Sequence, residues 1–158
     1  MRGLELKVPP LVVVILMSMA MWSASWYTPA LSFKFPGSVV LAASAAIAGA
    51  IASASGVISF KRAGTSVNPM KPGSSSSLVC SGIYAFTRNP MYLGFLLMLI
   101  GWSSYLSNVL AFPMVPFFIF YLNRFQIEPE ERVLSVGFGQ EFVIYRARVR
   151  ELFVYTNM

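Results

Sequence analysis

The sequence predicts an all-α integral membrane protein with about four transmembrane helices and an amphipathic C-terminal helix on the cytoplasmic side. Three observations predict this class: of the 158 residues, 56% are hydrophobic and only 11% are charged, and the mean hydropathy is +0.66. A soluble domain carries about 25% charged residues, so most apolar residues here need lipid rather than a self-contained core. Composition therefore excludes disorder and argues against a water-soluble globule.

Four apolar runs are candidates for membrane spans within a single domain of residues 1–158. They cover residues 8–27, 39–60, 90–105 and 109–123. The last two runs form a hairpin joined near Ser107 and Asn108, and each is about 16 residues long, or ~24 Å at 1.5 Å per residue. This length is near the lower limit for crossing a bilayer, so we expect local thinning or interfacial burial.

The basic residues predict the orientation. Eleven of the twelve lie before the first span, between the second and third, or after the fourth, and only Lys34 lies on the opposite side. All six acidic residues lie on the same side as the eleven. The positive-inside rule assigns that side to the cytoplasm, so we expect both termini there. The alternative is a cleaved signal peptide over residues 1–25, which would leave three spans.

An apolar stripe follows the fourth span. At the spacing of a helix, its members are Leu134, Phe138, Phe142, Tyr145, Val149 and Leu152. Arginines flank the stripe, which predicts a helix over about 129–151 that lies on the anionic inner leaflet. Gly137 and Gly139 are candidate points for a bend in this helix.

The residue inventory limits the chemistry. The chain has no histidine and a single cysteine, Cys80, which excludes a Ser-His-Asp site, His-ligated metal and an intrachain disulfide. We therefore expect no metal site, and we interpret Cys80 as a small buried or interfacial thiol. Topology explains the basic residues, so we expect no nucleic-acid partner. No ionisable residue lies in the middle of a span, which argues against a channel or transporter.

Two charged elements flank the predicted hairpin. Asn89 and Pro90 have the sequence of a helix N-cap and first position, which puts Arg88 beside a helix N-terminus that favours anions. Glu130 and Glu131 follow the fourth span and favour cations. Because the two ends of a hairpin return to one surface, we expect these elements to lie close together. They suit a zwitterionic ligand, although helix capping and interfacial anchoring explain the same residues without one.

At these residues the chain resembles the isoprenylcysteine carboxyl methyltransferases and their relatives, the phospholipid methyltransferases. The matching segments are residues 78–94 (LVCSGIYAFTRNPMYLG), 130–134 (EERVL), 138–139 (FG) and Tyr145, in the order and spacing of the family. The resemblance covers about half of the chain. It implies a membrane enzyme that uses S-adenosylmethionine (SAM) at the cytoplasmic end of the hairpin, rather than a soluble Rossmann methyltransferase.

The resemblance also implies roles for individual residues. It implies that the SAM pocket is lined by Ser76, Leu78, Val79, Tyr84, Asn89, Pro90, Met91, Tyr92 and Glu130. Arg88 is implied as the catalytic arginine that orients the acceptor, and Glu130 is expected to attract the amino group of SAM. A carboxylate acceptor is already ionised at neutral pH and needs no histidine base.

Two positions depart from the family and bear on the substrate. Asn89 replaces the usual histidine, and Gln126 stands where the prenylcysteine enzymes have a substrate-binding arginine, for which the nearby Arg124 is a candidate substitute. The implied acceptor is a lipophilic or lipid-anchored carboxylate. The alternatives are a phospholipid amine, with Glu131 or a neighbouring carboxylate as the base, a small thiol, and a non-catalytic bundle of membrane helices. The sequence does not predict the oligomeric state.

Overall fold

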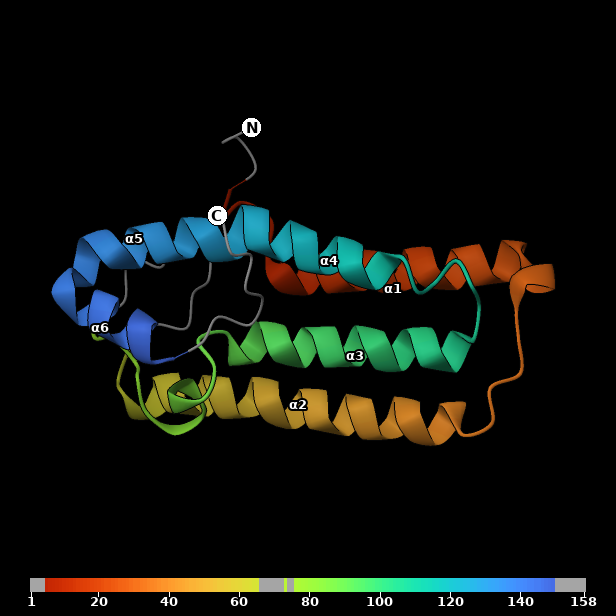
Figure 1. Ribbon diagram of the computed structural model, residues 1–158, viewed down its shortest axis with the longest axis horizontal. Helices are drawn as coiled ribbons and strands as arrows, with labels where there is room; N and C mark the ends of the chain where they lie inside the picture. The colour runs from red at the N-terminus through yellow and green to blue at the C-terminus, as the bar shows by residue number, and fades with distance from the viewer. Residues whose placement is uncertain (1–4, 66–72, 74–75, 150–158) are drawn as a thin grey trace.

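A computed structural model describes residues 5–65, 73 and 76–149, and these residues form an all-helical bundle (Figure 1). The helices are α1 (Pro10–Tyr27), α2 (Ser38–Arg62), α3 (Pro90–Leu106), α4 (Met114–Leu122), α5 (Glu128–Phe138) and α6 (Gln140–Arg148). Short 3-10 turns at Pro29–Leu31 (η2) and Gly82–Ala85 (η4) and a π-helical segment at Asn123–Ile127 (η5) complete the described structure. Helices α1 to α4 run along the long axis, and α6 folds back beneath α5 at one end.

Helices α1 and α2 are long and apolar enough to cross a membrane by length and composition. They have 18 and 25 residues, and only 22% and 17% of their most apolar windows are buried inside the protein. Their exposed side chains include large apolar groups such as Leu16 and Val40. Helix α3 is also apolar but has 17 residues, and α4 has nine. The all-helical class is therefore confirmed, whereas a count of four spans stays a prediction.

The first three predicted spans match α1, α2 and α3 to within two residues at each end. The fourth span, predicted from residue 109, is wrong at its start because α4 begins at Met114. Asn108 causes the difference. Its side chain is fully buried, its Oδ1 accepts from the Leu110 N–H at 3.0 Å, and its Nδ2 donates to the Thr28 carbonyl at 2.9 Å. Together with the hydrogen bond from the Val109 N–H to the Leu31 carbonyl at 3.1 Å, these bonds fix the first of the turns that precede α4.

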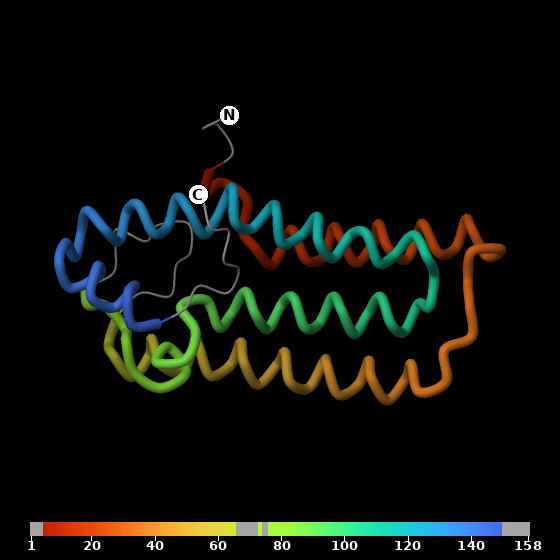
Figure 2. Tube along the Cα trace, in the orientation of Figure 1, coloured from red at the N-terminus to blue at the C-terminus, as the bar shows by residue number. Residues whose placement is uncertain are grey.

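The single helix predicted over 129–151 is also wrong. Helix α5 continues directly from α4 through η5, so that the three segments form one rod (Figure 2). The rod ends at Phe138, where Gly139 takes φ +52° and ψ −124°, a conformation that side chains with a Cβ rarely adopt. The chain then reverses into α6, which ends at Arg148. Residues 150 and 151 lie outside the described part.

The apolar stripe does not lie along one surface helix as predicted. Phe142, Tyr145 and Val149 form a buried cluster, and Leu134, Phe138 and Leu78 pack against it. The helical spacing is confirmed within α5 and α6, but the turn at Gly139 folds the stripe onto itself and onto the loop before α3. Leu152, the last predicted member, lies outside the described residues.

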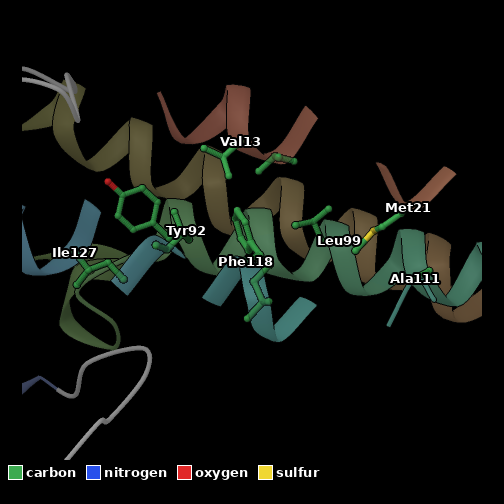
Figure 3. Close-up of a cluster of buried hydrophobic side chains, with 10 residues drawn as sticks. Val13, Met21, Tyr92, Leu99, Ala111, Phe118 and Ile127 are labelled. Atoms are coloured by element: carbon green, nitrogen blue, oxygen red, sulfur yellow. The ribbon is translucent and has the colours of Figure 1, made fainter. Parts of the chain in front are cut away.

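The main core lies between α1, α3 and α4 (Figure 3). Tyr92 and Ile127 lie at one end of this cluster, and Met21 and Ala111 lie at the other. Helix α2 packs on α3 differently, through small residues. A Cβ added to Gly94 would collide with the Oγ of Ser53 and the carbonyl oxygen of Gly49, so the two backbones are nearly in contact. This contact fixes the start of α3, which carries part of the candidate site.

Candidate active site

A cluster of charged and tyrosine side chains lies at the end of the bundle where α2 ends and α3 begins. Four elements meet there: the loop that contains η4, the first turns of α3, the start of α5, and α6. The predicted closeness of the two ends of the hairpin is confirmed, because Arg88 and Glu131 form an ion pair of 3.2 Å between Nη2 and Oε1. Both side chains are nearly buried, with exposed fractions of 6% and 13%.

Glu131 also contacts a second arginine. Its Oε2 lies 3.6 Å from the Nε of Arg146 on α6, whose side chain is 57% exposed. The sequence pointed to Arg146 only as a cationic flank of the stripe. Nothing in the linear pattern placed it at this site, because the turn at Gly139 brings α6 back toward α5.

Glu130 lies beside this ion pair and contacts α3. The hydroxyl of Tyr92 donates a hydrogen bond to Oε2 of Glu130 at 2.9 Å. Desolvation by burial raises the pKa of Glu130 to about 7, and the nearby Glu131 carboxylate acts in the same direction, whereas the Tyr92 hydrogen bond opposes them. A buried carboxylate with a raised pKa favours a cationic ligand, because the cation would stabilise its ionised form.

Two further tyrosines close the cluster. The hydroxyl of Tyr145 on α6 donates to the main-chain carbonyl of Tyr84 in η4 at 2.8 Å. The ring of Tyr84 packs edge-on against Phe60 at a centroid distance of 5.3 Å. Burial raises the pKa of both Tyr84 and Tyr145, so both hydroxyls stay protonated at neutral pH. Tyr145 was part of the family pattern, but its role as an anchor between α6 and η4 was missed.

The predicted helix start at Asn89 and Pro90 is confirmed, since α3 begins at Pro90. The Asn89 side chain, however, makes no capping hydrogen bond. Its Nδ2 is buried and has no hydrogen-bond partner among the described residues. An unsatisfied buried amide donor is costly, so this atom suits an acceptor on a ligand. Met91, the next residue of α3, is partly buried.

The predicted residues of the preceding loop are positioned unevenly. Val79 is buried and Leu78 packs on the α6 cluster. Ser76 is exposed, and its main-chain N–H donates to the Oγ1 of Thr65 at 2.9 Å. Leu78 and Val79 therefore support the loop from inside, whereas Ser76 lies at its surface.

Arg124 and Gln126, both predicted to bind substrate, contact the N-terminal segment instead of the Arg88 cluster. The Nη1 of Arg124 pairs with Glu5 at 3.3 Å and with Glu128 at 3.5 Å. Gln126 is fully buried, and its Nε2 donates to the carbonyl of Val8 at 2.6 Å. These contacts attach the start of α1 to η5, and a substrate role for either residue stays a prediction.

An arginine and a buried carboxylate lie together at one end of a helical hairpin, an arrangement that would suit a zwitterionic ligand. A family comparison gives the class of protein. Residues 38–141 match the phospholipid methyltransferase family, so the chain belongs to this family of SAM-dependent methyltransferases.

Individual relatives include one uncharacterised protein and several named methyltransferases. An uncharacterised protein of Haemophilus influenzae is 45% identical over 60 residues, which is 38% of this chain and 95% of that protein. The protein-S-isoprenylcysteine O-methyltransferase of Saccharomyces cerevisiae is 37% identical over 82 residues, which is 50% of this chain and 33% of that enzyme. The human enzyme of the same name is 34% identical over 73 residues, which is 46% of this chain and 26% of that enzyme.

The chain thus spans a third or less of the length of these two methyltransferases. No solved structure matches it significantly.

Proposed function

We propose that this protein transfers a methyl group from SAM to a lipophilic carboxylate at the cytoplasmic surface of a membrane. The observation that carries the proposal is the Arg88–Glu131 ion pair of 3.2 Å beside the Glu130–Tyr92 hydrogen bond. One site thereby offers a guanidinium for an anionic acceptor and a buried carboxylate for a cationic cofactor. Membership of the family supports the reaction type.

The residues present fit SAM. The amino group of SAM would be held by Glu130, whose buried carboxylate is stabilised in its ionised form by a cation. The buried Nδ2 of Asn89 is a donor suited to the carboxylate of the same ligand. Tyr84, Pro90, Met91 and Tyr92 would form the walls beside these two groups. When bound, SAM supplies an activated methyl group on a sulfonium centre.

The protein's contribution to the reaction is alignment and exclusion of water. Arg88 would bind the acceptor carboxylate and hold one oxygen toward the methyl group, without any proton transfer. Such positioning can lower a barrier by ~7–11 kcal/mol. The apolar surroundings of Val79 and Leu78 would keep water from the reacting atoms. A chain without histidine can perform this chemistry, because the acceptor is ionised at neutral pH.

An amine acceptor is the second candidate, and one observation favours it. The family match carries the description phospholipid methyltransferase, and phospholipid amines would require a base to remove an ammonium proton. Glu131 is the carboxylate that pairs with Arg88, and its second oxygen contacts Arg146, so both of its oxygens already lie beside guanidinium groups. The carboxylate acceptor therefore remains the proposal.

We further propose that α1, α2, α3 and α4 all cross the bilayer, with the site on the cytoplasmic side. The exposed apolar faces of α1 and α2 would then contact lipid tails. A lipophilic acceptor would reach Arg88 from within the bilayer.

The test is a methyl-transfer assay on the full chain in lipid nanodiscs with radiolabelled SAM. The acceptors are an S-farnesylcysteine analogue, phosphatidylethanolamine and a small thiol. We expect base-labile label in the prenylcysteine, because alkali hydrolyses a methyl ester but not an N- or S-methyl group. Arg88→Met should lower kcat by about 100-fold or more, as loss of a preorganised hydrogen-bond donor does in other enzymes. Base-stable label in phosphatidylethanolamine would replace the carboxylate proposal with the amine one.

A matched control is Arg148→Gln, since Arg148 lies exposed on α6. This variant should keep its kcat within about twofold, because an exposed charge has little effect at a distance. Absence of SAM binding in a folded sample would favour the non-catalytic helix bundle.

A further inference from the structure

The Glu131 carboxylate is shared between two arginines that differ in burial. Its Oε1 lies 3.2 Å from Nη2 of Arg88, which is 6% exposed, and its Oε2 lies 3.6 Å from Nε of Arg146, which is 57% exposed. Arg88 precedes α3, whereas Arg146 belongs to α6, so Glu131 connects the two sides of the site with one oxygen each.

We propose that Glu131 is an exchangeable counter-ion of Arg88, and that Arg146 is the positioning residue which makes the exchange possible. With no acceptor bound, the carboxylate of Glu131 pairs with the guanidinium of Arg88. When the acceptor carboxylate binds Arg88, Glu131 gives up that contact and keeps its contact with Arg146. This inference rests on the proposed function, because it assumes a carboxylate acceptor.

Burial explains why a second arginine is needed. A carboxylate that is 13% exposed has little access to water, so the loss of a counter-ion is costly. Arg146 already contacts the other oxygen of Glu131 and therefore lowers the cost of leaving Arg88. Without Arg146, Glu131 would compete more strongly with the substrate for Arg88.

The fold keeps Arg146 within reach of Glu131. Tyr145, its neighbour in sequence, is anchored by the hydrogen bond to the Tyr84 carbonyl and by the cluster with Phe142 and Val149. Arg146 is thus held at the rim of the site by a packed helix rather than by a loop. Its half-exposed guanidinium can follow Glu131 through a small displacement.

The experiment measures binding of an S-farnesylcysteine analogue to the full chain in nanodiscs by calorimetry, without SAM. The methyl ester of the same analogue is the matched neutral ligand. The variants are Glu131→Gln, Arg146→Gln, the double variant, and Arg148→Gln as a control for the general loss of positive charge on α6.

Four results are expected. Glu131→Gln should lower the Kd of the carboxylate, because a competitor for Arg88 is removed. Arg146→Gln should raise that Kd by about two- to fivefold, the factor that a partly exposed ion pair contributes. In the Glu131→Gln background, Arg146→Gln should have no more effect than Arg148→Gln, because its partner is gone. The Kd of the ester should stay constant throughout.

Several outcomes would overturn the exchange. One is a Glu131→Gln protein that binds the carboxylate more weakly than the wild type. Another is a change in Kd on Arg146→Gln that is equally large in the wild type and in Glu131→Gln, which would mean that Arg146 acts on the ligand through its charge alone and not through Glu131. A third is wild-type binding of the carboxylate no tighter than that of the ester. Should Glu131→Gln fail to fold, the Arg146→Lys variant provides the test instead. Lysine keeps the positive charge, so this variant should bind the carboxylate with the wild-type Kd. A Kd equal to that of Arg146→Gln would contradict the proposal.

The two proposals fail separately. Because binding is measured without SAM, the mutant cycle succeeds or fails irrespective of methyl transfer. A wild-type protein that shows the expected cycle but forms no base-labile product would overturn the proposed function and leave the counter-ion exchange standing.

Discussion

Glu130 is the residue at which burial and charge have the clearest consequence. Its carboxylate accepts a hydrogen bond from Tyr92, yet desolvation raises its pKa from 4.5 to about 7. The protein without ligand therefore holds a proton on Glu130 through much of the acidic range. A cation placed beside this carboxylate must release that proton, which couples ligand binding to pH.

We predict that SAM binding weakens as the pH falls below about 7, the pKa of Glu130. Because that pKa is raised in the unliganded protein and lowered by a bound cation, binding releases a proton below pH 7. The Kd should rise by up to tenfold per pH unit between pH 7 and 5. Calorimetry across this range checks the slope. Glu130→Gln should bind SAM weakly with no slope, and an unchanged slope in this variant would remove Glu130 from the cofactor site.

At the residue scale, the features that could be predicted from the sequence are those set by neighbouring residues and by the hairpin. The N-cap position of Asn89 and the meeting of Arg88 with the acidic pair followed from local signals and from the hairpin. Arg146 was missed because its place depends on a reversal eight residues after the acidic pair. Arg124 remained ambiguous, because a sequence does not reveal that Glu5 lies within reach of it.

At the scale of elements, α6 depends on one backbone conformation. Gly139 has φ +52° and ψ −124°, and Gly137, two residues earlier, lies within α5 with open space around it. The sequence marked both glycines as candidate bends, but only the positive φ distinguishes them. The predicted continuous helix failed here because spacing reports helical periodicity and not the direction of the chain after a turn.

We predict that Gly139→Ala destabilises the docking of α6 by about 1–2 kcal/mol, because a Cβ is strained in this conformation. Hydrogen exchange of the amides of residues 140–148 should accelerate accordingly. Gly137→Ala is the matched control: its added Cβ meets nothing within 4 Å, and it should stabilise α5 by about 0.5–1 kcal/mol. Equal exchange in the two variants would argue against the strained turn.

The contact between α2 and α3 makes a second prediction at this scale. Gly94→Ala should lower the free energy of unfolding by about 2–3 kcal/mol, because the added methyl meets the backbone carbonyl of Gly49 as well as Ser53. Thermal unfolding in detergent measures the loss. Gly56→Ala, in the same interface, meets mainly the flexible Met91 side chain at 2.9 Å and should cost less. The reverse order of the two losses would contradict this packing.

At the scale of the whole molecule, the charge pattern predicts that the site faces the cytoplasm. Cys80 is the only cysteine, and the interpretation of it as a buried thiol is wrong, because it is exposed at the end that carries the site. Partial desolvation of its sulfur and the nearby Glu141 carboxylate raise the pKa of the thiol, so labelling requires mildly alkaline pH. A membrane-impermeant maleimide should label Cys80 in inside-out vesicles and not in sealed cells.

The matched variant is Cys80→Ser with Lys34→Cys, which moves the single thiol to the exposed linker between α1 and α2. This variant should show the opposite pattern of labelling. Labelling of both thiols from the same side would mean that α2 does not cross the bilayer.

Because α4, η5 and α5 form one continuous helical rod, the number of residues in η5 sets the rotation of α5 relative to α4. A π-helical turn accommodates one more residue than an α-helical turn. The π-helical segment η5 lies between Leu122, which packs in the apolar core, and the carboxylates of Glu130 and Glu131. Deleting a single residue of η5 would rotate α5 by about 100° around the helix axis. Tyr92 would then lose its hydrogen bond to Glu130, although both side chains would still be present.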